Sequence, residues 1–313
     1  MDNNDSVAQI KRPIKEFTRV GFALSAMVLA IYVAKYPLIF LIKNCLPVLL
    51  KPPFRQWTAL GLSAVCIYLI GFPIMMLLLR KIPSLKATEK KKIGPTKFLT
   101  YLVITFGAMY ISNFITLLIV MILSWLKGSM LINPLESLQG GNIFANFLYG
   151  AILAPIMEEV IFRGVMVNKL RKYGDVVAIL GSALAFGLIH GNISQILYAF
   201  TAGVIFAYIT LRSGTIQYSI LIHVLVNSLG LIVAPWVAQK QNIMLTAVLG
   251  MVVITMISVG TLLFVINFRI IRLERGTVEF STKQLVKQLF FNWGMISYYI
   301  VSLILIVSMI VMV

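Results

Sequence analysis

Long hydrophobic stretches, separated by short polar segments rich in Lys and Arg, follow one another along the whole chain. Most are about 20 residues or longer, the length that a helix needs to cross a ~30 Å hydrocarbon core. They are continuous, whereas the strands of a membrane β-barrel alternate. We therefore predict an all-α fold, a polytopic transmembrane helical bundle of about eight to nine spans. The nine predicted crossings are residues 20–42, 58–79, 98–126, 143–172, two within 176–211, 216–237, 243–268 and 291–313.

The basic residues fall mainly in alternate polar segments. With the amino terminus in the cytoplasm and nine crossings, 21 Lys and Arg lie in cytoplasmic segments and five in outer loops. The richest cytoplasmic segment, residues 80–97, holds seven of them. Cytoplasmic loops of membrane proteins carry such an excess of positive charge. We therefore predict a multi-pass protein of the cell membrane, from a bacterium, with a cytoplasmic N-terminus.

Composition supports the membrane assignment. Hydrophobic residues make up 60% of the chain and charged residues 12%, against about 25% charged in soluble domains. The net charge of +17 does not call for nucleic acid, because the basic residues lie in loops beside lipid headgroups. The expected partners are membrane lipids and a peptide or protein substrate at the membrane, with no nucleic acid. Cys45 and Cys66 are too few for a disulfide framework.

The fifth and sixth crossings are predicted to be short. Asp175 and Arg212 both lie on the cytoplasmic side, and the 36 residues between them reach about 54 Å as helix. Two full crossings need about 60 Å and a turn. The turn at His190-Gly191-Asn192 should therefore lie at membrane depth, in a short re-entering helix pair. Irregular backbone is tolerated there only inside protein or beside a watery cavity.

Two adjacent carboxylates, Glu158 and Glu159, stand inside the hydrophobic run that begins at Ile143. The chain has only ten acidic residues, and the other eight lie in the N-terminal tail or in predicted loops. Charge at membrane depth is costly and is therefore typical of a functional site. Helix lengths place Glu158 and His190 at similar depth, and His223, the second of the chain's two histidines, is compatible with it. We predict that these groups form one polar site.

Helical spacing sorts these side chains by face. Glu159 and Arg163 are four residues apart and can pair, whereas Glu158 is one position off that line and can face elsewhere. The same spacing relates His223 to Asn227, and Phe186 to His190. Pro155 loosens the helix before Glu158 and can admit water.

The predicted cluster can perform hydrolysis. A desolvated carboxylate beside a neutral His can hold and deprotonate a water. A second His and an Asn amide can donate hydrogen bonds to a developing oxyanion. No metal and no cofactor is predicted. Each residue also has a structural interpretation: the Glu159–Arg163 pair as a clamp between helices, Phe186 as packing, and Asn227 as an interhelical hydrogen bond.

Three motifs resemble those of a known family. Glu158-Glu159-x-x-x-Arg163, Phe186-x-x-x-His190 and His223-x-x-x-Asn227 are similar to the motifs of the CPBP family. Its members are CAAX prenyl endopeptidases and bacteriocin-processing enzymes, also called the Abi family of intramembrane glutamic proteases. The resemblance covers about Gly150 to Leu229.

The resemblance implies roles for these residues. Glu158 would be the general base, and Glu159 and Arg163 would support it. The oxyanion would be stabilised by His190, His223 and Asn227. The catalytic core would be residues 143–232, between N-terminal helices in 1–142 and C-terminal helices in 233–313.

The predicted function is an intramembrane endopeptidase that hydrolyses a peptide bond of a membrane-associated peptide or protein with a Glu-activated water. One alternative is a non-catalytic membrane scaffold or a bacteriocin self-immunity or regulatory protein, as some members of the family are. Another is a zinc-dependent protease using His190, His223 and a Glu, although the chain has no H-E-x-x-H motif. A third is a transporter, because Glu and His also form proton relays, although no internal repeat is visible.

Overall fold

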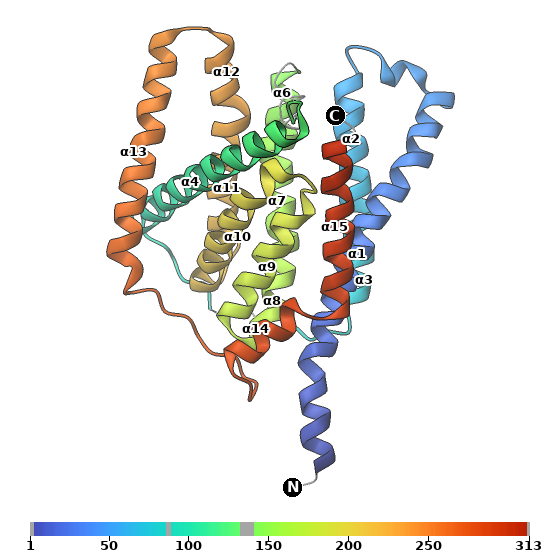
Figure 1. Cartoon of the computed structure of the whole chain (residues 1–313), viewed down its shortest axis with the longest axis vertical. Coiled ribbons are helices and arrows are strands. Elements are labelled where there is room, and N and C mark those ends of the chain that lie inside the picture. Colours follow the sequence, from blue (N-terminus) through green and yellow to red (C-terminus); the bar gives the residue numbers. More distant parts are fainter. Residues whose placement is uncertain (1–2, 86–88, 132–140, 312–313) are drawn as a thin grey trace. The chain divides into compact units, whose positions relative to one another are not determined.

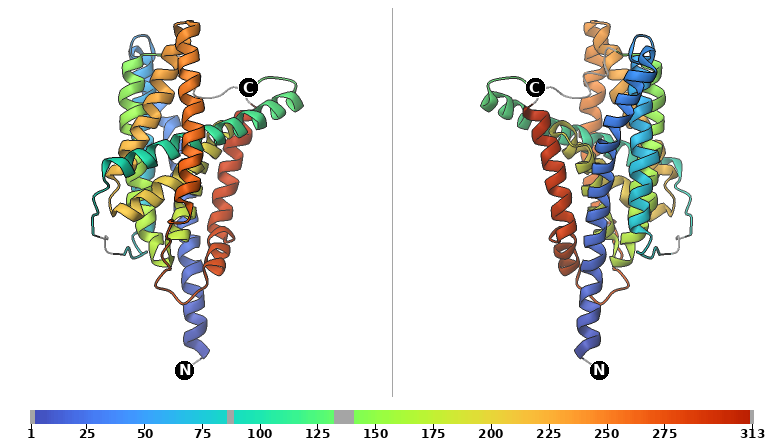
Figure 2. Two further views of the ribbon diagram at one scale, coloured as in Figure 1. Left: turned by 90° about the vertical axis from the view of Figure 1, so that its left-hand side faces the viewer. Right: turned by 90° about the vertical axis from the view of Figure 1, so that its right-hand side faces the viewer.

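The computed structural model describes residues 3–85, 89–131 and 141–311 (Figures 1 and 2). Over these ranges the chain is helical and forms no sheet, which confirms the all-α prediction. The described part contains seven helices that are long and apolar enough to cross a membrane. They are Pro13–Cys45, Arg55–Leu79, Pro95–Lys127, Ile193–Ser213, Gln217–Gln239, Ile243–Phe268 and Trp293–Val311.

The other two predicted crossings are helices of a different kind. The run that begins at Ile143 is helical through Tyr173, close to the predicted end, but its hydrogen-bonding register changes several times. Helix α9 (Asp175–Ile189) has 15 residues, or about 22 Å, so it is shorter than a ~30 Å core. The predicted turn between the fifth and sixth crossings is present, because α10 (Ile193–Ser213) begins directly after it. The predicted short pair is wrong for its second helix, since the 21 residues of α10 are long enough to cross a membrane and only α9 is short.

The chain divides into two compact units. The first unit ends at Leu85 and is completed by Thr277–Leu305, and the second comprises Lys86–Gly276 and Ile306–Val313. This division rests on contacts within the fold, whereas the predicted catalytic core at residues 143–232 rests on motifs. The predicted core therefore stays a prediction. All predicted site residues lie in the second unit.

Helix α1 (Asn3–Cys45) is the longest helix of the first unit. It packs against the helical run made of α2 (Arg55–Ala64), a π-helical segment and α3 (Phe72–Leu79). It also crosses α15 (Trp293–Val311) where Gly21 meets Gly294. A Cβ atom on Gly21 would lie 2.1 Å from the carbonyl carbon of Gly294, so only glycine allows the two backbones to approach this closely.

The polar segment after residue 268 contains a helix that the hydrophobic pattern did not predict, α14 (Thr282–Phe290). Ser281 accepts a hydrogen bond from the backbone N–H of Gln284, and the Gln284 side chain accepts one from the backbone N–H of Ser281. This reciprocal capping box stabilises a helix start. Leu285 and Leu289 on one face are buried in the first unit.

In the second unit, α10 packs along α9 and α4 (Pro95–Lys127), and α4 runs obliquely across α13 (Ile243–Phe268) (Figure 1). Two glycines allow α4 and α13 to approach closely where they cross. A Cβ atom on Gly107 would lie 2.6 Å from the carbonyl oxygen of Met256, and a Cβ atom on Gly260 would lie 2.6 Å from the carbonyl oxygen of Val103. Small residues bring membrane helices together in this way. A buried cluster joins α4, α10 and α11 (Gln217–Ser228): Phe106, Ala202, Phe206, Ile209, Ile222 and Val226.

An ionic group, which we call the end cluster, ties α9, α10 and the segment after α13 together. It consists of Asp175, Arg212 and Glu274. Arg212 pairs with Asp175, and its Nη1 atom lies 3.3 Å from Glu274 Oε1. The backbone N–H of Glu274 donates to Asp175 Oδ2 over 2.9 Å. The start of α9 and the end of α10 thus lie together at the same end of the helix pair, as predicted.

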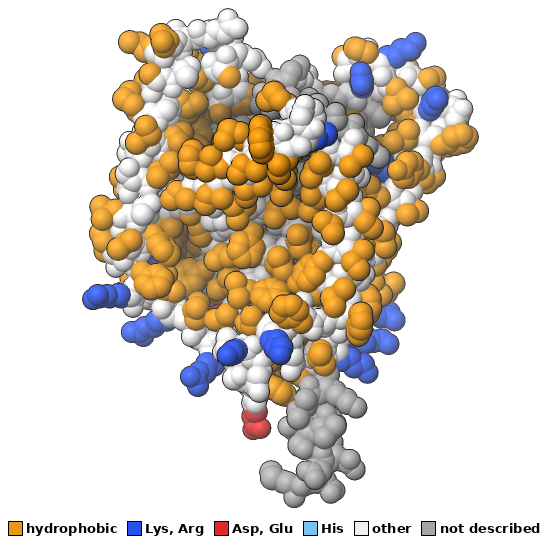
Figure 3. All heavy atoms as spheres, in the orientation of Figure 1, with side chains coloured by type: hydrophobic (Ala, Val, Ile, Leu, Met, Phe, Trp, Pro, Cys, Tyr) orange, Lys and Arg blue, Asp and Glu red, His pale blue; other side chains and the backbone are white. Residues whose placement is uncertain are grey.

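The surface matches a protein that spans a membrane. On the face shown in Figure 3, hydrophobic side chains cover the helices along most of their length, and Lys and Arg side chains lie toward the helix ends. A bilayer favours this pattern, in which charged side chains lie at the ends of the helices and hydrophobic side chains cover the part between them.

Candidate active site

The helical run from Ile143 to Tyr173 carries the two carboxylates, and it is interrupted by two π-helical segments. The first, Phe147–Leu153, precedes α7 (Ala154–Glu159), and the second, Val160–Val167, follows it. In a π-helix, hydrogen bonds join residues five apart, and such segments occur frequently at functional sites. The sequence predicted a helix that Pro155 loosens before Glu158, but neither π-helical segment was predicted.

The first π-helical segment explains the position of Asn227. The backbone N–H of Ala154 donates to the carbonyl oxygen of Tyr149, and Pro155 has no N–H. Neither of the two residues that would normally donate to the Gly150 carbonyl therefore does so. The side-chain Nδ2 of Asn227 donates to this oxygen over 2.9 Å. Asn227 therefore bonds α11 to the loosened helix, as its structural interpretation predicted.

Side chains also satisfy carbonyl groups of the second π-helical segment. Ser182 Oγ, on α9, donates to the Phe162 carbonyl over 2.9 Å. Asn168 Nδ2 donates to the Gly164 carbonyl over 2.6 Å. These bonds hold the backbone that follows Glu159 in its irregular register.

Glu159 is completely buried and occupies the centre of the site. Arg163 Nη1 lies 3.0 Å from Glu159 Oε1, which confirms the pairing predicted from their spacing. His223 Nδ1 lies 3.1 Å from the same oxygen. An ionised carboxylate only accepts hydrogen bonds. Nδ1 of His223 therefore carries a proton and donates a hydrogen bond to Glu159.

Glu158 points away from that line, as the spacing predicted, and its side chain is 25% exposed. Its Oε2 atom lies 3.6 Å from His223 Nε2, which is too far for a hydrogen bond but close enough for strong electrostatic interaction. The His223 ring therefore has one carboxylate at each nitrogen.

Three aromatic rings enclose the guanidinium group of Arg163, which is fully buried. The guanidinium carbon lies 4.4 Å from the ring centre of Phe186, 5.2 Å from that of Phe206 and 6.0 Å from that of Phe162. Ring faces attract cations within about 6 Å. Over the described ranges, no nitrogen of the Arg163 guanidinium forms a hydrogen bond of good geometry. Its contacts are therefore the ion pair from Nη1 to Glu159 and the three rings.

Three residues of this enclosure, Phe162, Phe206 and Gly203, were not predicted from the sequence. Phe206, on α10, also stacks near His223 with ring centres 5.0 Å apart. Gly203, one turn earlier, makes room: a Cβ atom there would lie 2.9 Å from the Ala183 Cα and 3.3 Å from Arg163 Nη2. The only signal in the sequence is a glycine inside a predicted helix, which often has a packing reason.

His190 ends α9 and is only partly buried. Its Nδ1 atom lies 2.8 Å from the Phe186 carbonyl oxygen. A carbonyl oxygen can only accept, so Nδ1 carries the proton and Nε2 of the neutral ring is left as an acceptor. Gly191 then turns the chain at φ +61°, and Asn192 Nδ2 donates to the His190 carbonyl over 2.9 Å.

Phe186 connects the two histidines. Its ring centre lies 5.1 Å from that of His190 and 5.7 Å from that of His223, edge to face in both cases. Phe186 thus lies beside both histidines and Arg163, and both carboxylates lie at His223. In the described part of the chain, no three His, Cys, Asp or Glu side chains are placed to hold a metal ion.

These features define a multi-pass helical membrane protein with a charged site inside its bundle. Residues 140–229 match the sequence model of a family described as type II CAAX prenyl endopeptidase, Rce1-like. The matched segment contains all six predicted site residues. Over these residues the chain is similar to a family of CAAX prenyl endopeptidases.

Two curated relatives are similar to parts of the chain. The "Membrane-embedded CAAX protease MroQ" of Staphylococcus aureus is 24% identical over 209 residues, which cover 61% of this chain and 83% of that protein. The "Putative membrane peptidase YdiL" of Bacillus subtilis is 30% identical over 82 residues, which cover 26% of this chain and 34% of that protein. No solved structure matches the chain significantly.

Proposed function

We propose that this protein is an intramembrane endopeptidase in which Glu158 activates a water to hydrolyse a peptide bond of a membrane-associated peptide or protein. The observation that carries the proposal is the contrast between two adjacent carboxylates. Glu159 is 0% exposed and is held by Arg163 and His223. Glu158 is 25% exposed and, among the described residues, accepts no hydrogen bond, so its oxygens are available to a water.

In the proposed mechanism, the water lies between Glu158 and Nε2 of His190, which is left as a hydrogen-bond acceptor when Nδ1 bonds to the Phe186 carbonyl. Glu158 removes one proton as the water oxygen bonds to the peptide carbonyl carbon. The carbonyl π electrons move to its oxygen and form an oxyanion. When the oxyanion collapses and the C–N bond breaks, Glu158 returns the proton to the leaving nitrogen.

His223 and Asn227 are the proposed oxyanion donors. In this proposal a doubly protonated His223 ring donates from Nε2 to the oxyanion, while its Nδ1 remains bonded to Glu159. An amide carries two N–H donors, and Asn227 uses one on Gly150. Among the described residues, the other N–H has no acceptor and can donate to the oxyanion. Glu159 and Arg163 support the site through His223 and do not contact the reacting atoms in this proposal.

The proposed setting is a bacterial cell membrane with the N-terminus in the cytoplasm. Cys45 tests this orientation without any substitution, because it is an exposed free thiol at the end of α1. It should react with a membrane-impermeant thiol reagent in intact cells. A cysteine introduced at Lys90, in the Cys45→Ser background, should react only after the cells are opened. The reverse labelling would overturn the orientation.

The function is tested by comparing peptides released from membranes of cells that make the wild type, Glu158→Gln or Glu274→Gln. Glu274→Gln is a matched control, since it makes the same chemical change in the end cluster. Peptides present with the wild type and with Glu274→Gln, but absent with Glu158→Gln, support the proposal. If the biological effect of the protein persists in Glu158→Gln, the non-catalytic scaffold or self-immunity function replaces it. Loss of cleavage with a chelator, restored by zinc, would favour the zinc protease.

A further inference from the structure

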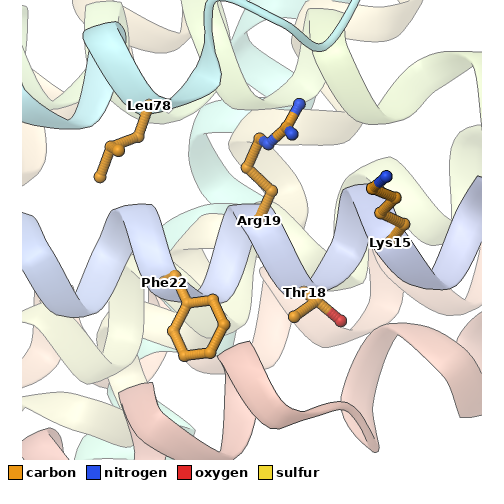
Figure 4. Close-up of a pocket in the computed structure, with 5 residues that line it drawn as sticks. All are labelled: Lys15, Thr18, Arg19, Phe22 and Leu78. Carbon is orange, nitrogen blue, oxygen red and sulfur yellow. The ribbon is translucent and has the colours of Figure 1, made fainter.

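A cavity of about 300 Å³ lies between α1 and α3 in the first unit, far along the chain from the site motifs. Lys15, Thr18, Arg19 and Phe22 line it from successive turns of α1, and Leu78 lines it from the last turn of α3 (Figure 4). Residues three and four apart share a helix face. Because a water occupies about 30 Å³ of liquid, the cavity has room for a polar group of the size of a phosphodiester.

The cavity is positively charged at one end. Lys15 and Arg19 are one helical turn apart, and Figure 4 shows both side-chain ends directed to the same side of α1, toward α3. Neither forms an ion pair with a carboxylate of the described residues. Both lie in the first two turns of the membrane-spanning part of α1, which begins at Pro13. They are thus two cations without a counter-ion at the level of lipid headgroups.

The cavity is apolar at its other end. Phe22 is 47% exposed and Leu78 is 39% exposed, and both are further along the span than the two cations. Polarity therefore changes from charged to hydrocarbon in the direction in which α1 enters the bilayer. A free phosphate ion would use only the first part of this surface, whereas a lipid uses both.

We propose that this cavity binds an anionic phospholipid, with its phosphate between Lys15 and Arg19 and an acyl chain along Phe22 and Leu78. Arg19 can hold two phosphate oxygens in a fork, and Lys15 supplies a point charge. The Thr18 hydroxyl donates its proton to the Ile14 carbonyl over 2.7 Å, so it offers none to a headgroup. The site therefore selects negative charge and not a particular headgroup alcohol. This proposal does not depend on the proposed protease activity.

The test uses the full-length protein in detergent, stripped of lipid, and native mass spectrometry to measure binding of phosphatidylglycerol and phosphatidylcholine. Wild type should bind phosphatidylglycerol in preference. The double variant Lys15→Gln/Arg19→Gln should bind it roughly thirtyfold more weakly, since each cation near a lipid surface contributes about fivefold. Arg80→Gln/Lys81→Gln removes the same charge directly after α3, outside the cavity, and should bind as the wild type does.

Three results would overturn the proposal. Equal binding of the two lipids would show that charge is not selected. An equal loss in both double variants would show a diffuse attraction to the whole basic end. Displacement of the lipid by millimolar inorganic phosphate would make the cavity a site for free anions. Because the four substituted residues are not buried in the core, unchanged thermal unfolding in phosphatidylcholine confirms that each variant is folded.

Discussion

Two ionic clusters in the second unit contain the same kinds of residue in opposite environments. In the site, the Glu159 and Arg163 side chains are 0% exposed. In the end cluster, the side chains of Asp175, Arg212 and Glu274 are 2%, 17% and 65% exposed. The end cluster is partly open to solvent and accepts a backbone hydrogen bond. The ion pair of the site contacts aromatic rings and His223 instead.

The difference distinguishes a structural ion cluster from the proposed reaction centre. Asp175 accepts a hydrogen bond from the backbone of Glu274 besides its ion pair, and both helix ends that it joins are fixed. Glu159 keeps one oxygen, Oε2, without a partner among the described residues. Burying an ion pair rarely adds net stability. The buried pair is therefore better explained by the hydrogen bond through which Glu159 holds His223 than by its own contribution to folding.

The largest expected effect on stability comes from removing the buried cation. Arg163→Met leaves Glu159 without its counter-ion and should lower the free energy of unfolding by about 3–5 kcal/mol. Arg163→Lys should recover only part of this loss, because an ammonium group is more strongly hydrated and does not stack on Phe186 as a guanidinium does. Unfolding of the purified variants in detergent measures both. Full stability of the Lys variant would mean that the three rings do not select the guanidinium group.

Asn227→Ala separates the two functions given to this side chain. Loss of one oxyanion donor should lower the cleavage rate by about 10²–10³-fold. The Gly150 carbonyl also loses its donor, and an unsatisfied buried group costs about 1–3 kcal/mol. We expect slow but measurable cleavage together with moderately lower stability. A destabilised variant that cleaves at the wild-type rate would leave Asn227 with its structural role alone.

Close packing around Arg163 is tested at Gly203. Gly203→Ala places a methyl group 2.9 Å from the Ala183 Cα, and such overpacking typically costs about 1–3 kcal/mol. Gly250→Ala, in α13, is the matched control because a Cβ atom there meets nothing within 4 Å. In a helix it should be neutral or slightly stabilising. Equal stability of the two variants would contradict the close α9–α10 approach.

The smallest effect is expected in the end cluster. Arg212→Met should reduce stability by about 1 kcal/mol, since partly exposed ion pairs contribute little and Asp175 keeps its backbone partner. High salt should weaken the wild type toward the variant by screening this pair. A loss as large as that of Arg163→Met would erase the distinction between the two clusters.

Much of the architecture could be predicted because it depends on local composition. Hydrophobic length located the spans, and α13 begins and ends at the predicted residues 243 and 268. Spacing of four residues predicted the Glu159–Arg163 pair and the separate direction of Glu158. The length between Asp175 and Arg212 predicted the turn at His190.

The remaining features depend on contacts between distant parts of the chain. Phe206 and Gly203 enclose Arg163 only once α10 is placed, and no spacing rule relates them to it. The acceptor of Asn227 is Gly150, and the π-helical segment that leaves this carbonyl without a donor was not visible in the hydrophobic pattern. The helix α14 was missed because its nine residues are mostly polar, although Ser281 and Gln284 form a recognisable capping signal.

The central claim is that Glu158, and not its neighbour, is the base. The most direct test is the cleavage rate of purified wild type and Glu158→Gln in liposomes, on a peptide found by the comparison of released peptides. The side chain keeps its shape, so unfolding should be unchanged while the rate falls by about 10⁴-fold, at the upper end for a lost general base. Cleavage by Glu158→Gln at the wild-type rate would contradict the account.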